Sequence, residues 1–167
     1  PEEALKILEP AFQAERREQQ ANPFTYALAS RISTALGQVD AAKNWLDLAI
    51  QAFDRDVRKL KRHFGKIPDS YREYTVSIMG AAAELHDHRM VFELYKRWQS
   101  YHISWENKYL AGIAAFNLGK YKQAVKLWAG IEKVFQASTL MQQVAFLIAR
   151  GIIPPFEMSY KQPWEKG

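Results

Sequence analysis

The sequence predicts an all-α protein, a right-handed superhelical solenoid of about four antiparallel helix pairs. Two observations predict this fold class. Apolar side chains recur at spacings of three and four residues along most of the chain, which is the period of helices with one buried face. Similar helix corners also recur, and they are 49, 33 and 32 residues apart, at Gly37, His86, Gly119 and Gly151. A period in the low thirties is typical of stacked helix pairs, and the longer first step indicates one pair with an insertion.

Length and composition agree with a folded domain. The chain has 167 residues, of which 48% are hydrophobic and 25% are charged, as in ordinary soluble proteins. It contains no cysteine, which excludes disulfides and thiolate chemistry but suits any compartment. The apolar runs are too short to span a membrane, and we expect a cytoplasmic protein. Because the chain opens at Pro1, in what resembles the second helix of a pair, we expect it to be a fragment of a longer protein.

Caps and helix breakers divide the chain into a series of expected helices. Asn22 and Pro23 start the second helix as its cap and first-turn proline, and Ser104 caps the sixth. Gly65 ends the third helix, and a proline follows it closely. The expected helices cover residues 1–20, 23–36, 39–64, 70–85, 89–101, 105–118, 121–135 and 138–150.

The helix over residues 39–64 is longer than a regular repeat needs. It would extend over about 39 Å. Its apolar stripe runs without a break through Ala42, Leu46, Ala49, Phe53, Val57, Leu60 and Phe64. The overhanging half of the stripe, from Phe53 onwards, needs a cover. Either the helices that follow cover it, or it is the face of a homodimer, and the sequence leaves both alternatives open.

Residues 154–167 are expected to form a capping tail behind a repeat domain over residues 1–153. A pair of prolines at the start of the tail prevents the last helix from continuing. Phe156, Tyr160 and Trp164 make the segment too aromatic for a simple disordered end. We expect it to fold back over the last exposed helix face. Whether it also occupies a binding groove is left open.

The corner at Gly119 carries small and aromatic residues at fixed offsets. They are Gly112, Gly119, Tyr121, Ala124 and Trp128. This pattern resembles the tetratricopeptide repeat, a helix–turn–helix unit. Weaker copies surround Gly37 and His86, and a half copy lies in the first helix. The resemblance covers most of the chain up to Ile153 with one strong copy, and another helix-pair solenoid is the alternative.

The resemblance implies that the first helix of each pair lines a concave groove. The groove-lining positions then include Phe24, Arg31, Glu73, Ser77, Glu106, Tyr109, Ile113 and Asn117. The clamp with which related proteins bind a C-terminal carboxylate is absent from the matching positions. The mixed lining favours an amphipathic helix or an extended peptide of a partner protein, oriented by Arg31, Glu73 and Glu106. The chain's own tail or a second copy are the alternative occupants.

The densest basic stretch, at residues 55–66, lies at the end of the long helix in a chain with a net charge of +5. Arg55, Arg58, Lys59 and Arg62 form a candidate patch for nucleic acid or for an acidic partner. Charge runs on helices more often only face solvent. Binding through this patch is therefore the alternative to peptide binding.

The sequence shows no motif for catalysis or for a cofactor. His86, Asp87 and His88 are the most metal-like triplet, but no nearby residue completes a four-ligand site, and histidine tolerates a left-handed corner. No glycine-flanked nucleophilic serine is present. We therefore expect no metal, no cofactor and no enzyme activity. The predicted function is that of a scaffold module that binds a partner protein in a preformed groove.

Overall fold

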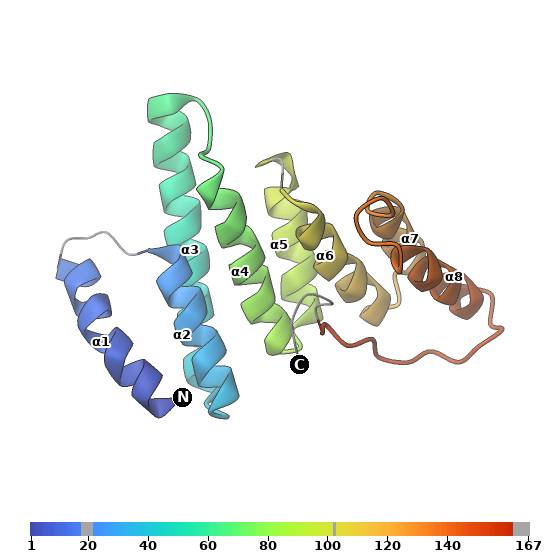
Figure 1. Cartoon of the computed structure of the whole chain (residues 1–167), viewed down its shortest axis with the longest axis horizontal. Coiled ribbons are helices and arrows are strands. Elements are labelled where there is room, and N and C mark those ends of the chain that lie inside the picture. The colour runs from blue at the N-terminus through green and yellow to red at the C-terminus, as the bar shows by residue number, and fades with distance from the viewer. Residues whose placement is uncertain (18–21, 102, 162–167) are drawn as a thin grey trace. The chain divides into compact units, whose positions relative to one another are not determined.

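The computed structural model describes residues 1–17, 22–101 and 103–161, and these residues form helices and connecting segments without any strand (Figure 1). The helices are α1 (Glu2–Arg17), α2 (Pro23–Ala35), α3 (Val39–Phe64), α4 (Ser70–Glu84), α5 (His88–Trp98) with a 3-10 turn (Gln99–Tyr101), α6 (Trp105–Asn117), α7 (Tyr121–Ala129) and α8 (Ser138–Ala149). The all-α prediction is confirmed. The chain divides into two compact units, Pro1–Leu85 and His86–Gly167. The prediction of one repeat domain over residues 1–153 stays a prediction.

The glycine corners share one backbone geometry. Gly37, Gly119 and Gly151 have left-handed φ angles of 75°, 76° and 72°. After each glycine, the next residue donates its main-chain N–H to the carbonyl five residues before it, at 2.9, 2.8 and 2.9 Å. This hydrogen bond defines the Schellman cap, which closes a helix through a left-handed residue. His86 has φ 54°, so all four predicted corners turn through a left-handed residue.

The predicted end of the seventh helix was wrong. Helix α7 ends at Ala129 and not at Phe135. The N–H of Gly130 donates to a carbonyl three residues earlier at 3.3 Å, which tightens the last turn. The ring of Phe135 packs instead against Trp105 and Tyr109 of α6, with ring centroids 6.1 and 5.3 Å apart. Tertiary packing of Phe135 thus takes precedence over the helical pattern of the sequence.

In the first unit, α2 packs against both α3 and α4, and α1 packs against α2. Small residues lie where these helices cross. The hydroxyl of Ser30 in α2 donates to the carbonyl of Ala42 in α3 at 2.7 Å. The small residues 80–83 of α4 are all buried, as a close approach of two helices requires.

The overhanging stripe of α3 is covered only in part. Phe53 and Val57 are 1% and 2% exposed, and the Phe53 ring lies 6.0 Å from that of Tyr71 in α4. Leu60 is half-buried, and Phe64 is 72% exposed. The helix that follows therefore covers the nearer half of the overhang, and Phe64 at its end faces solvent.

In the second unit, α6 packs against both α5 and α7, and α7 packs against α8. Gly112 lies at the crossing of α6 and α7, where the indole of Trp128 occupies the space that a Cβ atom would need. The indole N–H of Trp128 donates to the carbonyl of Tyr109 at 3.4 Å. Gly112 and Trp128, two of the small and aromatic positions predicted at the Gly119 corner, thus pack directly against each other.

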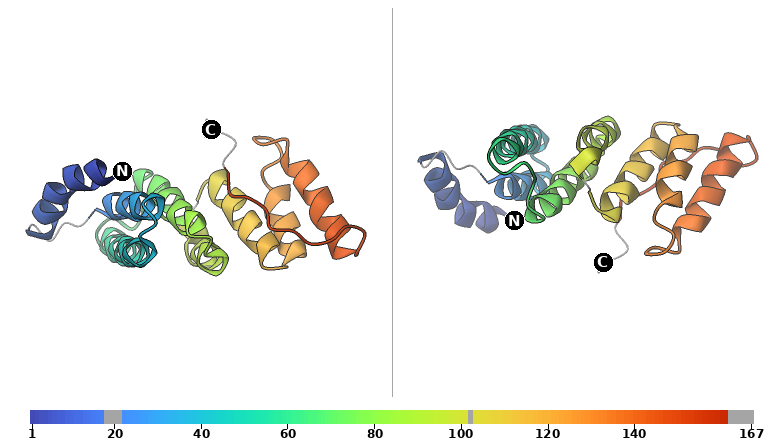
Figure 2. Two further views of the ribbon diagram at one scale, coloured as in Figure 1. Left: turned by 90° about the horizontal axis from the view of Figure 1, so that it is seen from below. Right: turned by 90° about the horizontal axis from the view of Figure 1, so that it is seen from above.

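Residues 154–161 form an extended segment that leads back from the end of α8 to α6 (Figure 1, Figure 2). In Figure 2 it is the dark red stretch of chain that leaves α8 without any helical turn. The contacts of this extended segment are with α6 and the start of α5, whereas Phe146 of α8 stays 53% exposed. Trp164, the last aromatic residue of the predicted tail, lies outside the described residues.

Candidate peptide-binding site

The predicted groove residues of the first unit lie on α2 and α4. Arg31 forms a salt bridge with Glu84 of α4 at 2.7 Å. Phe24 is exposed, and its ring lies 6.2 Å from a tyrosine ring of α4. Glu73 is exposed and Ser77 is half-buried. Arg31 thus has an acidic partner in its own unit, with which a ligand of the predicted kind must compete.

In the second unit, the predicted groove residues of α6 meet the extended segment. Tyr109 and Asn117 both form hydrogen bonds with it. Ile113, one helical turn from each of them, is fully buried. Glu106 lies in the first turn of α6, where the helix dipole favours an acid. The chain's own segment therefore occupies this face of α6.

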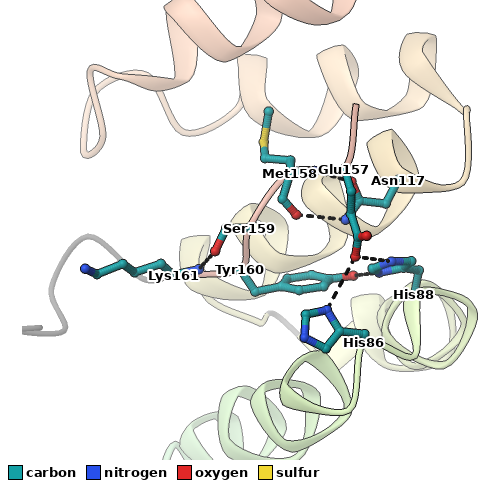
Figure 3. Close-up of polar contacts among 8 residues, drawn as sticks. All are labelled: His86, His88, Asn117, Glu157, Met158, Ser159, Tyr160 and Lys161. Atoms are coloured by element: carbon teal, nitrogen blue, oxygen red, sulfur yellow. Dashed lines mark hydrogen bonds and ion pairs between the residues drawn. The ribbon is translucent and has the colours of Figure 1, made fainter. Parts of the chain in front are cut away.

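Asn117 holds the main chain of the segment through both halves of its amide (Figure 3). The N–H of Met158 donates to Asn117 Oδ1 at 2.7 Å, and Asn117 Nδ2 donates to the carbonyl of Met158 at 3.0 Å. This pairing satisfies two main-chain groups of an extended residue and makes no demand on its side chain. It therefore recognises extended backbone.

Two further contacts hold the segment on α6. The hydroxyl of Tyr109 donates to the carbonyl of Lys161 at 2.9 Å. The ring of Phe156 packs against that of Phe116, with centroids 5.3 Å apart. The segment is thus anchored before, at and after Met158.

The corner before α5 receives an acidic and a phenolic side chain of the segment (Figure 3). The carboxylate of Glu157 lies 3.4 Å from Nδ1 of His86 and 3.2 Å from Nε2 of His88. The hydroxyl of Tyr160 lies 2.7 Å from Nδ1 of His88. Burial raises the pKa of Tyr160 well above its usual range, and the charge of Glu157 raises it further. The phenol of Tyr160 is therefore protonated at neutral pH.

The His86-Asp87-His88 triplet thus contacts the segment, which the sequence reasoning did not foresee. Asp87 caps α5 by accepting the N–H of Met90 at 3.1 Å. No group of three or more histidine, cysteine or acidic side chains is placed to hold a metal ion in the described parts of the chain. The sequence did hold one signal for this contact, the histidine at a corner position where the other corners have glycine. A residue with a side chain in a left-handed conformation is often found at a functional site.

A separate cavity of about 360 Å³ opens between α5, α6 and α7. The side chains that line it are Phe92, Tyr95, Lys96, Gln99, Lys108, Gln123, Lys126 and Leu127. The ammonium groups of Lys96 and Lys120 lie 5.1 and 4.8 Å from the centre of the Phe92 ring, within the range of cation–π attraction. Sequence reasoning missed this cavity because its lining comes from three helices.

The predicted basic patch lies on the last turns of α3. Arg58, Lys59 and Arg62 are exposed, and Arg55 lies 3.4 Å from the carboxylate of its neighbour Asp56. The helix dipole favours positive charge in a last turn, where α3 carries three basic residues. Part of this charge is therefore explained by helix stability alone.

Among the residues that the structure describes, no helix combines the length and the apolar surface needed to cross a membrane. Comparison of the chain with protein-family models, with curated proteins and with solved structures found no match.

Proposed function

We propose that the chain is a protein–protein interaction module that binds an extended peptide of a partner protein across α6. The observation that carries the proposal is the pair of hydrogen bonds between Asn117 and the main chain of Met158. When proteins bind extended peptides, main-chain hydrogen bonds supply affinity and pockets for side chains supply specificity. Asn117 and Tyr109 supply the main-chain hydrogen bonds. Phe116 and the corner at His86 supply the contacts for side chains.

The proposal includes the architecture that the repeats imply, a right-handed solenoid of tetratricopeptide-like helix pairs. The shared Schellman geometry at Gly37, Gly119 and Gly151 supports it, since repeated units require repeated corners. The contact of Gly112 with Trp128 supports it further. Binding is the whole proposed mechanism, without a catalytic step or a cofactor.

The test is binding of a peptide in trans to the full chain. The receptor carries Met158→Pro, which removes the N–H that donates to Asn117, and Tyr160→Ala, which removes the contact with His88. The probe is a fluorescent peptide with the sequence of residues 154–161, PPFEMSYK, and the readout is fluorescence anisotropy. We expect the peptide to bind the receptor at least tenfold more tightly than the wild-type chain. A tethered internal ligand acts at an effective concentration on the order of millimolar and so blocks the wild-type site.

Two controls make the test specific. Asn117→Ala in the receptor should weaken binding about tenfold, because it leaves main-chain groups of the peptide unpaired. Gln143→Ala, which removes an exposed amide on α8, should leave it unchanged. Trypsin cleavage after Lys161 reports release of the segment. A folded receptor that is cleaved rapidly and still fails to bind the peptide would overturn the proposed function.

A second candidate function is binding of nucleic acid or an acidic partner through the end of α3. The exposure of Arg58, Lys59 and Arg62 favours it. Affinity for such a ligand falls steeply with salt, because bound counterions are released. The test measures binding of a fluorescent single-stranded DNA at salt concentrations from about 50 to 200 mM, the range over which such effects are large. If this candidate holds, the double variant Lys59→Glu, Arg62→Glu should bind the DNA more weakly than the wild-type chain. Affinity that neither salt nor these substitutions changes would exclude it.

A further inference from the structure

The corner at His86 differs from the three glycine corners because its left-handed residue has a side chain. Glycine adopts a left-handed φ without strain, whereas His86 adopts φ 54° with a side chain present. Its imidazole faces the carboxylate of Glu157 at 3.4 Å, a contact that glycine cannot make. Because both side chains are largely exposed, this pair contributes more to orientation than to affinity.

His88 combines two contacts in one ring. Its side chain is only 19% exposed, and its two nitrogens face Glu157 and Tyr160. A neutral imidazole with its proton on Nε2 donates to the carboxylate and accepts the phenolic proton on Nδ1, so that one tautomer satisfies both. The ring therefore recognises an acid and a hydroxyl that lie three residues apart in an extended chain.

The residues between the acid and the tyrosine contribute through other groups. Met158 binds Asn117 through its main chain. The hydroxyl of Ser159 accepts the N–H of Lys161 at 3.1 Å, within the segment itself. The residue before the acid, Phe156, packs on Phe116. Aromatic, acidic and phenolic side chains thus each contact a defined residue of α5, α6 or the corner between α4 and α5. Of the two residues between the acid and the tyrosine, Met158 binds α6 through its main chain and Ser159 bonds within the segment.

We propose that this site recognises a short extended motif, an aromatic residue, an acid, two variable residues and a tyrosine, in a partner protein. This proposal rests on the peptide-binding function proposed above and names its ligand. Residues 156–160 are the chain's internal copy of the motif, and they occupy the site until a partner's copy displaces them. Displacement is governed by the effective concentration of the tethered copy.

The same geometry selects against a phosphorylated tyrosine. The hydroxyl of Tyr160 binds an imidazole that already holds the carboxylate of Glu157. Phosphate would place about two further negative charges beside this carboxylate and remove the donated proton. Phosphorylation of a partner's tyrosine therefore weakens binding, and phosphorylation of Tyr160 frees the site.

The experiment compares peptides on one receptor, the full chain with Met158→Pro and Tyr160→Ala. The probes are PPFEMSYK, the variants with Phe or phosphotyrosine in place of its Tyr, the variant with Gln in place of its Glu, and a scrambled sequence. We expect the Phe variant to bind about tenfold more weakly, because it leaves the acceptor nitrogen of His88 unpaired. We expect the Gln variant to lose about threefold, because an amide oxygen accepts a weaker hydrogen bond than a carboxylate. The phosphotyrosine and scrambled peptides should lose at least tenfold.

A receptor variant tests the assignment to His88. His88→Phe should remove the preference for the tyrosine peptide over the phenylalanine peptide, as a double-mutant cycle requires for a direct contact. His63→Gln, which replaces an exposed histidine of α3, should retain the tenfold preference. The peptide series itself needs no change at His88, so it remains decisive where His88→Phe does not fold.

The failures of the two proposals are distinguishable. Binding of the scrambled and Phe peptides as tight as that of PPFEMSYK would overturn the motif and leave the peptide-binding function standing. A released receptor that binds none of the peptides would overturn both. A wild-type dimer, detected by light scattering and dissolved by PPFEMSYK, would make a second copy the occupant and overturn the assignment to a partner.

Discussion

At the scale of single residues, Gly112 determines how closely α6 and α7 approach. A Cβ atom at this position would overlap the indole of Trp128. The rigid ring cannot move aside cheaply in a packed core, because interiors are packed as densely as organic crystals. The absence of a side chain at one position thus allows the largest side chain to be buried at another.

We predict that Gly112→Ala lowers the free energy of unfolding by about 1 to 3 kcal/mol, the usual cost of overpacking a core. Urea unfolding followed by circular dichroism measures this change. Gly130→Ala is the matched control, because the nearest atom to its added Cβ would be the flexible ammonium of Lys108 at 3.3 Å, and the carbonyl of Leu127 would lie at an ordinary contact distance of 3.6 Å. The control should change stability by less than about 0.5 kcal/mol. Equal effects of the two substitutions would contradict this account of the helix crossing.

Tyr71 makes stability depend on pH in the alkaline range. Burial raises the pKa of Tyr71 from 10.0 to about 12, and the carboxylate of Asp56, which accepts its hydroxyl at 3.2 Å, adds to the shift. Because the folded value lies above the unfolded one, the stabilisation is present below pH 10 and is lost as the pH rises through about 12.

We predict that Tyr71→Phe makes the free energy of unfolding fall less steeply between pH 10 and 12 than in the wild-type chain. Urea unfolding at a series of pH values measures the slope. Tyr121→Phe serves as the matched loss of another tyrosine. The prediction is wrong if Tyr71→Phe and Tyr121→Phe leave the same slope as the wild type.

At the scale of elements, the apolar stripe of α3 is buried along most of its length and exposed to solvent at its end. Its residues recur regularly from Ala42 to Phe64, yet the last buried residue of the stripe is Val57. Phe53 is 1% exposed and Phe64 is 72% exposed. Periodicity identifies the face of a helix that can be buried, and the neighbouring helix decides how much of that face is buried.

We predict that Phe53→Ala destabilises the chain by about 3 to 5 kcal/mol, as for a buried phenylalanine. Phe64→Ala should change the free energy of unfolding by less than about 0.5 kcal/mol. The two variants make the same chemical change on one helix, so each is the control for the other in urea unfolding. A large loss in Phe64→Ala would show that something covers the end of α3 in solution.

At the scale of the whole molecule, the open question from the sequence is whether α3 forms a dimer face. Phe53 and Val57 are buried within the first unit, so the part of the overhang that a second copy could contact shrinks to Phe64 and the half-buried Leu60. A stable dimer buries about 800 Å² on each partner. Two such side chains supply far less than this area.

We therefore predict that Phe64→Asp leaves the solution mass of the chain unchanged at every concentration, as measured by light scattering. The charge would disrupt an apolar interface at this position. Asp substitution at the exposed Lys61 provides a control for a change of charge alone on the same helix. A wild-type dimer that Phe64→Asp dissolves, and Lys61→Asp does not, would restore the dimer face.

The sequence by itself determined the helices and most of their ends, because those depend on local interactions. Asn22 caps α2 by accepting the N–H of Phe24 at 2.9 Å, and Ser104 caps α6 with a reciprocal contact to Asn107. The left-handed corners at Gly37, Gly119 and Gly151 follow from residue type in the same way. All these interactions span a few residues, so composition and spacing are enough to predict them.

Only the tertiary structure decided what the extended segment contacts and where α7 stops. Asn117 and Met158 are 41 residues apart, and His88 and Tyr160 are 72 residues apart. Sequence reasoning identified Tyr109 and Asn117 as groove residues and the tail as an alternative occupant, but it could not pair them. The position of Phe135 against Trp105 is decided in the same way. Periodicity describes one helix at a time, whereas a contact between distant residues depends on how the helices between them pack.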